Sequence, residues 1–411
     1  MAFETLCVVG LGYIGLPTAV TFAEHGVRVF GQDVNPAFVE EINRGEAPLV
    51  EPELAEHLAR VVADGLVSAA LTPQRADAFV IAVPTPFLPD KTADLSYIEA
   101  AAAEIAPVLY PGALVALEST SPPGTTEKLA GWLAAVRPDL VGADGGLLVD
   151  VIHCPERVLP GKILQELVTN DRIIGGLTPR AAERGKELYG IICQGQILLT
   201  DAATAELSKC VENSFRDVNV AFANELSLVC DTLGVDVWEL IELANHHPRV
   251  NILRPGPGVG GHCLAVDPWF IVEADPVNSR LIRTAREVND AKPDWVVDKA
   301  KAALGEARAP VIAALGLAFK PDIDDLRESP ARHIAATLAR AYPQGAVLAV
   351  EPNIHRLPPD LAALPNVALA DYQDALDRAD LVVLLVDHHQ FLDQPPLRPG
   401  IPVIDTRGRW R

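Results

Sequence analysis

Short runs of β-branched and aliphatic residues alternate with longer segments of helical periodicity, starting at the N-terminus. Such alternation is typical of parallel strands joined by crossover helices. In open α/β sheets, ligands bind at the carboxyl ends of the strands, so the loops that follow each strand are where chemistry is expected. The predicted strands of this first pattern are Leu6–Val9, Val27–Gly31, Phe79–Val83, Leu114–Leu117 and Leu148–Ile152.

A second alternating pattern appears late in the chain. Its predicted strands are Val311–Leu315, Ala346–Val350, Asn366–Leu369, Leu381–Val386 and Pro402–Ile404. Between the two patterns, Asp201–Leu233 lacks Pro and Gly and repeats apolar residues at helical spacing, which predicts one long helix. At ~1.5 Å per residue this helix extends for roughly 50 Å, which suits a spine between domains and a homodimer contact.

The length of 411 residues predicts two or three cores, at roughly 100 to 200 residues per domain. We therefore expect two α/β domains, residues 1–200 and 305–411, joined by a helical central domain, residues 201–304.

The net charge excludes several classes of partner. Lys and Arg number 34 against 55 Asp and Glu, which gives −21 and opposes binding to nucleic acid or an anionic membrane surface. The longest apolar run, Leu381–Val386, is far too short to span a bilayer, and the first residues lack the pattern of a secretory signal. None of the six cysteines forms a C-x-x-C pair, so neither a zinc site nor a disulfide framework is indicated. We expect a cytoplasmic protein without a metal.

A glycine-rich turn follows the first predicted strand directly. Gly10-Leu-Gly12-Tyr13-Ile14-Gly15 opens a helical segment, and its spacing serves a tight turn, backbone approach to a pyrophosphate and close packing of helix on strand. Asp33 follows the second strand, at the usual offset for a carboxylate that binds a ribose 2′-hydroxyl. The sequence thus predicts a Rossmann-like NAD site. Asp33 would repel the 2′-phosphate of NADP. The alternative, a glycine turn beside an ordinary acidic loop, is less favoured.

Two further loops lie where a bound cofactor would pass. Thr85 ends the third strand, while Thr120 and Thr126 belong to the loop after the fourth. Their hydroxyls and helix-start amides favour contacts with a phosphate or ribose. Each loop is equally typical of ordinary strand-ending turns.

The most unusual stretch is Pro255-Gly-Pro-Gly-Val-Gly260-Gly-His262-Cys263. Its glycines would allow a ligand to approach closely, and a thiolate at its end would be a nucleophile. Cys263 is therefore the candidate catalytic thiol, although a lone cysteine is usually an inert core residue. For His262, a turn histidine and a ligand contact remain equally open.

The long helix carries Lys209, Asn213 and Arg216 at i, i+4 and i+7, on one face. Such a polar stripe is functional if it faces the cofactor, and is otherwise a solvated surface. Glu156 and Arg157 follow the fifth strand, where they form either a second functional pair or a surface ion pair.

Taken together in order, these motifs resemble the nucleotide-sugar 6-dehydrogenase family over nearly the whole chain. Gly316-Leu-Ala-Phe-Lys320 adds to the resemblance. The stretch Asn245–Trp269, with His262 and Val266 where UDP-glucose dehydrogenases usually have Ser and Lys, looks most like the branch that acts on UDP-N-acetyl-D-mannosamine. The segments Asp322–Pro330 and Glu351–His355 also look like that branch.

The resemblance implies an enzyme that oxidises the sugar 6-hydroxyl to a carboxylate through a cysteine thiohemiacetal and thioester, forming two NADH. It implies a homodimer that supplies a cell-surface polysaccharide such as enterobacterial common antigen. The catalytic residues it implies are Cys263, Lys209, Asn213, Asp267, Glu156 and Thr120. The implied cofactor contacts are Gly10, Gly12, Tyr13, Ile14, Gly15, Asp33, Thr85, Thr126 and Arg327. The implied substrate contacts are Arg157, Val158, Lys209, Asn213, Arg216, His247, Arg249, Gly260, Phe319, Lys320 and Arg407.

Three alternatives stay open. The same chemistry on UDP-N-acetylglucosamine differs by one stereocentre. A non-catalytic NAD-binding sensor would bind NADH without producing it. A cysteine hydrolase would act without NAD.

Overall fold

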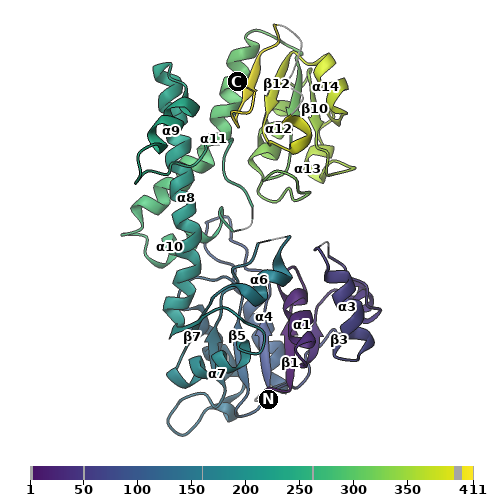
Figure 1. The fold of residues 1–411 in the computed structure, drawn as a ribbon, viewed down its shortest axis with the longest axis vertical. Coiled ribbons are helices and arrows are strands. Elements are labelled where there is room, and N and C mark those ends of the chain that lie inside the picture. The colour runs from purple at the N-terminus through teal and green to yellow at the C-terminus, as the bar shows by residue number, and fades with distance from the viewer. Residues whose placement is uncertain (1–2, 50, 160, 262, 393–399, 411) are drawn as a thin grey trace. The chain divides into compact units, whose positions relative to one another are not determined.

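The computed structural model describes residues 3–49, 51–159, 161–261, 263–392 and 400–410. The chain forms two compact units (Figure 1). The first consists of Met1–Glu212 with Glu273–Asp275, and the second of Asn213–Val272 with Pro276–Arg411. The division into three domains at residues 200 and 304 remains a prediction. No helix among the described residues combines the length and apolar character needed to cross a bilayer.

Within the described residues, the first unit is built on an eight-stranded sheet of order β3-β2-β1-β4-β5-β6-β7-β8. The strands are β1 Thr5–Val9, β2 Arg28–Gln32, β3 Val67–Ala70, β4 Ala78–Ile81, β5 Leu114–Leu117, β6 Asp150–His153, β7 Arg172–Gly176 and β8 Ile197–Asp201. The helices are α1 Gly15–Glu24, α2 Pro36–Asn43, α3 Leu54–Ala63, α4 Ser96–Ile105, α5 Thr125–Val136, α6 Ile163–Thr169 and α7 Pro179–Tyr189, with short 3₁₀ turns at Ala106–Val108 and Pro138–Leu140.

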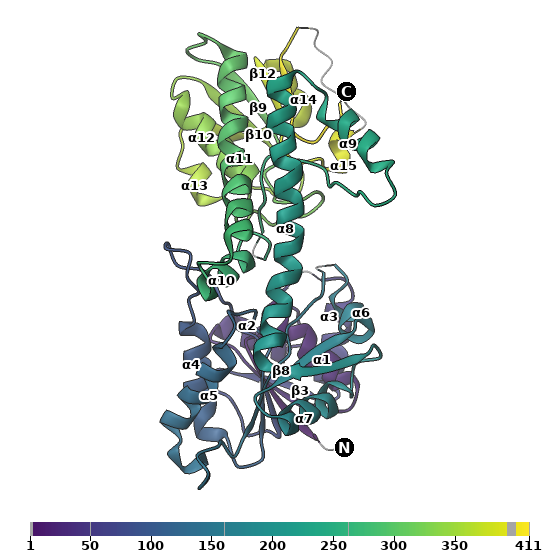
Figure 2. The same cartoon turned by 90° about the vertical axis from the view of Figure 1, so that its left-hand side faces the viewer.

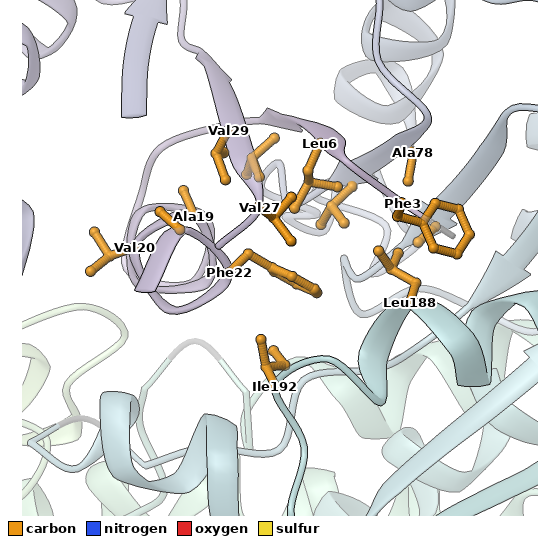
Figure 3. Close-up of a cluster of buried hydrophobic side chains, with 14 of the residues drawn as sticks. Phe3, Leu6, Ala19, Val20, Phe22, Val27, Val29, Ala78, Leu188 and Ile192 are labelled. Atoms are coloured by element: carbon orange, nitrogen blue, oxygen red, sulfur yellow. The ribbon is translucent and has the colours of Figure 1, made fainter. Parts of the chain in front are cut away.

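Both faces of this sheet are buried. In β1, Leu6 and Val8 belong to one apolar cluster, and Cys7 and Val9 to another on the opposite face. Figure 3 shows the first cluster, in which Phe22 of α1 lies among the side chains that cover the sheet. Burial on two faces explains why these strands read as continuous apolar runs in the sequence.

The sheet contains one antiparallel pair among its parallel strands. β6 and β7 pair antiparallel, through Ile152 with Gly176 and His153 with Gly175. β8 then pairs parallel to β7, so the last two strands run opposite to the rest. Neither strand was predicted, and β3 was also missed.

The long helix is confirmed as α8, Ala202–Leu233, which continues from the first unit into the second. In the second unit α8 lies beside α11, as Figure 2 shows and as side-chain bonds between the two helices require. The other helices of this region are α9 Val237–Asn245, α10 Asp267–Ala274 and α11 Arg280–Leu304.

The described part of the second unit also contains a five-stranded parallel sheet of order β11-β10-β9-β12-β13. Its strands are β9 Val311–Leu315, β10 Ala346–Val350, β11 Val367–Leu369, β12 Leu381–Leu384 and β13 Val403–Asp405. Its helices are α12 Pro330–Ala341, α13 Pro359–Ala362, α14 Tyr372–Arg378 and α15 His389–Leu392. The expected second α/β pattern is confirmed, so the fold class is two Rossmann-like sheets with a helical central region.

Candidate functional site

The glycine turn after β1 has the geometry that its spacing predicts. Gly10 adopts φ of +91°, and a Cβ there would lie 2.8 Å from the carbonyl oxygen of Ala82. A Cβ on Gly15 would lie 1.8 Å from the carbonyl oxygen of Gly10, so only glycine lets α1 approach the strand. A Cβ on Gly12, in contrast, would meet no heavy atom of the described residues within 4 Å. The space beside Gly12 is where a pyrophosphate fits. Tyr13 and Ile14 complete the turn, and no side chain caps the start of α1.

Two residues after the strands extend this site toward a dinucleotide. Asp33 is half-buried, and its Oδ2 accepts a hydrogen bond from the Leu11 amide at 2.9 Å, which fixes the carboxylate beside the turn. The hydroxyl of Thr85 is buried and has no hydrogen-bond partner among the described residues. An orphaned hydroxyl beside an open glycine turn fits NAD, which would satisfy it.

The prediction of a cofactor contact at Thr126 meets a structural obstacle. Thr126 is fully buried, and both its amide and its hydroxyl donate to Oε1 of Glu206, at 2.7 and 2.6 Å. Oε2 of the same carboxylate accepts the Gly124 amide at 2.6 Å. Glu206 thus binds the start of α5 and Thr126 is fully buried, so a cofactor contact at Thr126 stays a prediction.

Three predicted catalytic residues belong to elements at the carboxyl edge of the first sheet. Thr120 is half-buried after β5, and Glu156 follows β6. Lys209 lies on α8 next to Cys210, whose thiol approaches the carbonyl oxygen of Ser121 at 3.7 Å. The helix that carries Lys209 therefore contacts the loop of Thr120, and Glu156 follows the adjacent strand.

Glu156 is held from two sides. Its Oε1 accepts the Arg157 amide at 2.6 Å, and its Oε2 lies 3.3 Å from Nη1 of Arg172. Arg172 is itself buried and lies over the ring of Tyr189, 4.9 Å from its centroid. A buried cation fixes the orientation of Glu156 and compensates its charge.

Beneath this pair lies a second buried carboxyl group. The hydroxyl of Tyr189 donates to Oε1 of Glu118 at 2.7 Å. Burial, followed by the negative charge of Glu156, raises the pKa of Glu118 to about 7, although Arg172 opposes the shift. Glu118 is thus a group that changes charge near neutral pH inside the core of the first unit.

Cys263 differs in exposure from the cysteines of the strands. Burial raises the pKa of the Cys7 thiol to about 11 and that of Cys154 to about 12, which keeps both protonated and inert. Cys263 is half-buried, one turn before α10, in the second unit. A partly exposed thiol at the start of a helix is in the environment that favours a reactive thiolate.

Two predicted catalytic residues lie with Cys263 in the second unit. The backbone carbonyl of Cys263 accepts the Asp267 amide at 2.8 Å, which starts α10. The buried carboxylate of Asp267 accepts a hydrogen bond from the amide nitrogen of Asn213 on α8. The structure thus links the cysteine turn to the long helix through Asp267 and Asn213.

A buried polar network between α8 and α11 supports the same turn. Nη1 of Arg286 bonds Oδ1 of Asp217 at 2.6 Å and lies 3.5 Å from the carbonyl oxygen of Leu264. Asn224 accepts the Gly256 amide at 2.8 Å and donates to Asn289 at 2.8 Å. The start of the glycine run, at Gly256, and the residue after Cys263, Leu264, are therefore anchored to the paired helices.

The glycines of this run pack closely against the protein's own loops. A Cβ on Gly260 would lie 2.4 Å from the carbonyl oxygen of Glu328, and one on Gly261 would lie 3.0 Å from the ring of Phe319. A Cβ on Gly256 would lie 2.7 Å from Nη1 of Arg407. The glycines therefore make room for neighbouring loops, and a ligand contact at Gly260 stays a prediction.

A small cavity in the second unit joins three of the predicted substrate contacts. It measures about 70 Å³, and Phe319, Lys320 and Arg407 line it. Nε of Arg407 donates to Oδ1 of Asp387 at 2.8 Å. Although burial opposes it, the guanidinium groups of Arg407 and Arg409 lower the pKa of Asp387, which therefore stays ionised and holds Arg407 in place. A larger cavity of about 480 Å³ lies beside α9, and none of the predicted site residues lines it.

The other predicted substrate and cofactor contacts of the second unit and of the loop after β6 line neither of these two cavities. Arg157 pairs with Glu212 at 2.7 Å, and Val158 is half-buried beside it. Arg327 pairs with Asp325 at 2.6 Å within its own loop. Arg216, His247 and Arg249 are exposed and do not line the cavity of Phe319. His262 lies outside the described residues.

Sequence reasoning missed several residues that hold the site. These are Glu206, Arg172, Arg286, Asn224, Glu351 and His388. One signal was available, because Glu351 follows the second strand of its sheet as Asp33 does in the first. The others are contacts between distant segments, which a sequence pattern does not display.

Comparison with known proteins agrees with this architecture. The models of the UDP-glucose/GDP-mannose dehydrogenase family match residues 4–193 as the NAD binding domain, 203–291 as the central domain and 313–411 as the UDP binding domain. NAD is therefore confirmed as the cofactor.

Full-length relatives and a solved structure point the same way. The chain is 58% identical to the NDP-N-acetyl-D-galactosaminuronic acid dehydrogenase of Ralstonia nicotianae, over 99% of this chain and 96% of that one. It is 54% identical to the UDP-N-acetyl-D-mannosamine dehydrogenase of Escherichia coli K12, over 100% of both. The UDP-D-ManNAc dehydrogenase structure from Pyrococcus horikoshii superposes with a TM-score of 0.86 at 38% identity, covering 99% of this chain and 96% of that one. The chain belongs to the UDP-glucose/GDP-mannose dehydrogenase family.

Proposed function

We propose that the protein oxidises the 6-hydroxyl of UDP-N-acetyl-D-mannosamine to a carboxylate. The observation that carries this proposal is the half-buried thiol of Cys263 at the start of α10, tied to Asn213 through Asp267. The full-length identity to enzymes named for this substrate supports it. Per sugar, the reaction consumes two NAD and one water, and releases two NADH and three protons.

The residues of the chain take the following roles. The glycine turn of Gly10, Gly12 and Gly15, with Asp33, would hold NAD, which would supply the hydride acceptor for both oxidations. Lys209 takes the proton of the 6-hydroxyl and stabilises charge on that oxygen, to which Asn213 donates a hydrogen bond. The Cys263 thiolate attacks the aldehyde carbon, forming a thiohemiacetal that is oxidised to a thioester. Water then cleaves the carbon–sulfur bond, with Glu156, Thr120 and Asp267 placing it and moving its protons.

The nucleotide part of the substrate requires positive charge in a protein of net charge −21. We assign it to the cavity of Phe319, Lys320 and Arg407, where a guanidinium and an ammonium can bind phosphate oxygens. Arg157, Val158, Arg216, His247, Arg249 and Gly260 remain proposed contacts, and Arg327 a proposed cofactor contact.

The test is the amount of NADH released per sugar. Purified enzyme is given UDP-N-acetylmannosamine, UDP-N-acetylglucosamine and UDP-N-acetylgalactosamine separately, and absorbance is followed to completion. Two NADH from the mannosamine compound alone are expected. Turnover of the galactosamine compound instead would establish the second candidate, which the 58% identity to the Ralstonia enzyme favours. Turnover of none would leave an NAD-binding sensor.

We propose a second copy of the chain as the protein partner. Large apolar side chains recur along α8 in the second unit and are exposed, at 72% for Phe215, 53% for Phe222 and 70% for Leu233. A repeated apolar stripe of this size is typical of a subunit interface. Light scattering is expected to give a mass of twice 43.9 kDa, and Phe215→Glu with Phe222→Glu should halve it.

We also propose the cytoplasm as compartment, because the six cysteines are free thiols, as in a reducing environment. A cell-surface polysaccharide is the proposed destination of the product. The net charge supports the further proposal that the protein does not bind nucleic acid.

A further inference from the structure

The loop that carries Phe319 and Lys320 is built like the NAD turn of the first unit. Gly316 follows β9 with φ of +89°, and its amide donates to the carbonyl oxygen of Val350 at 2.8 Å. Gly10 follows β1 with φ of +91°, and its amide donates to the carbonyl oxygen of Gln32 at 2.8 Å. In both units the backbone therefore makes the same tight turn after the first strand of the sheet.

A carboxylate after the second strand braces each turn. Asp33 accepts the Leu11 amide at 2.9 Å. Glu351 accepts the amides of Leu317 and Ala318 at 2.7 and 3.0 Å through Oε2. The backbone amides that follow the glycine are thus oriented by an acidic side chain in each sheet.

The two carboxylates differ in what else they can bind. Asp33 is half-buried, which leaves part of it for a ribose hydroxyl. The side chain of Glu351 is fully buried, and its Oε1 accepts the backbone and side-chain amides of Asn353, both at 3.2 Å. Its Oε2 also lies 3.0 Å from Nε2 of His388. Glu351 is therefore saturated by the protein and does not act as a ribose ligand.

His388 connects the two ends of the loop. Its side chain is fully buried, and Nδ1 accepts the Asp322 amide at 2.9 Å. Since Nδ1 is an acceptor, the ring proton is on Nε2 and is donated to Glu351. One imidazole thus holds Asp322 directly and holds Leu317 and Ala318 through Glu351.

Between these two anchors lie only Phe319, Lys320 and Pro321. All three line the cavity of about 70 Å³. Asp322 adopts φ of +63°, a left-handed conformation that a non-glycine residue keeps only when its surroundings hold it. The bond from its amide to His388 is one such constraint.

We propose that His388 and Glu351 form a clamp that sets the Phe319–Lys320 loop in the conformation that binds the nucleotide diphosphate of the substrate. Both are positioning residues, since neither lines the cavity. The inference rests on the proposed function, which assigns substrate binding to this loop.

Removing the imidazole would leave the Asp322 amide without this partner and would take from Glu351 the one bond that ties it to Asp322, while its bonds to Leu317, Ala318 and Asn353 remain. The loop would then reach its binding conformation only in a fraction of molecules, which weakens binding by that fraction. Chemistry at Cys263 and NAD binding at the glycine turn do not use these bonds. The expected signature is a higher KM for the nucleotide sugar, with little change in kcat or in the KM for NAD.

The experiment compares full-length His388→Leu, His388→Gln and the control His333→Leu, an exposed histidine on α12. UDP alone serves as the probe in titration calorimetry, and steady-state kinetics follow. We expect His388→Leu to weaken UDP binding and raise the sugar KM about tenfold. His388→Gln, which keeps one donor and one acceptor, should recover part of the loss and supplies the same reading if the leucine variant fails to fold. His333→Leu should match the wild type.

Lys320→Ala separates this inference from the proposed function. If Lys320→Ala weakens UDP binding but both His388 variants bind UDP as the wild type does, the clamp is refuted while the substrate site stands. If Lys320→Ala leaves UDP binding unchanged, the assignment of substrate to this loop fails, and the clamp fails with it. An equal rise in the KM for NAD in His388→Gln would also overturn the clamp, because it would indicate general damage.

Discussion

The buried carboxyl group of Glu118 makes the stability of the protein depend on pH in a direction opposite to that of most acidic residues. Burial raises its pKa from 4.5 to about 7. Between these values the folded chain holds a proton that the unfolded chain has lost, so stability falls as pH rises through this window. The difference of about 2.5 pKa units, at about 1.4 kcal/mol each, means that the free energy of unfolding falls by about 3 kcal/mol when pH rises from below 4.5 to above 7.

Glu118→Gln should abolish this dependence, because an amide of the same shape stays neutral and still accepts the hydrogen bond from Tyr189. The variant and the wild type are expected to be equally stable near pH 4.5, and the variant to be more stable by about 3 kcal/mol at pH 8. Urea unfolding of the full chain at several pH values between these limits measures the difference.

The matched control is Glu99→Gln, which removes an exposed carboxylate from α4. The free energy of unfolding of this control should differ from that of the wild type by the same amount at every pH. If the difference between Glu118→Gln and the wild type is also independent of pH, Glu118 titrates as an ordinary carboxyl group, and the reasoning from its burial is refuted.

Four further predictions concern Cys263, Asp33 and two buried cations of α11, Arg286 and Lys292. Cys263→Ser should lose sustained release of two NADH per sugar in the absorbance assay, and full turnover by that variant would refute the thioester route. Asp33→Ala should raise the KM for NAD more than that for the sugar, since it removes both the ribose ligand and the brace on Leu11; an unchanged KM for NAD would remove it from the site. Arg286→Met leaves Asp217 buried without its cation and should lower the free energy of unfolding in urea by about 3–5 kcal/mol. Asp217→Asn should lower that free energy far less when added to Arg286→Met than when introduced into the wild type. Burial lowers the pKa of Lys292 from 10.5 to about 7, so wild-type stability should rise with pH across that window, and Lys292→Met should flatten the profile and stabilise the protein at pH 7.

The sequence predicts those parts of the fold whose physical signal is local. β5, β9 and β10 have the predicted bounds because buried parallel strands are apolar on both faces. α8 was predicted to within one residue because no glycine or proline interrupts its period. β7 was missed because it ends in two glycines, and β8 because its apolar run is only three residues long, Ile197–Leu199, before Thr and Asp.

The candidate site divides in the same way. The tight turn at Gly10 and the close packing at Gly15 agree with the predicted roles of these glycines, while the approach of a pyrophosphate at Gly12 stays a prediction. The packing of Thr126 against Glu206 and of Gly260 against Glu328 was not predicted, because the fold brings these partners from distant segments. The hydrophobic pattern of a strand does not indicate its direction in the sheet, so the antiparallel pairing of β7 could not be predicted from the sequence.

The helix after this strand pair reaches several loops of the first sheet. β8 ends at Asp201, level with Gly176 and hence with Ile152, one residue before the last residue of β6. In the helix that follows, Glu206 contacts the start of α5, Cys210 contacts Ser121, and Glu212 contacts Arg157. One continuous helix therefore contacts three loops of the first sheet, and it carries Lys209 past them on a rigid element instead of on a loop.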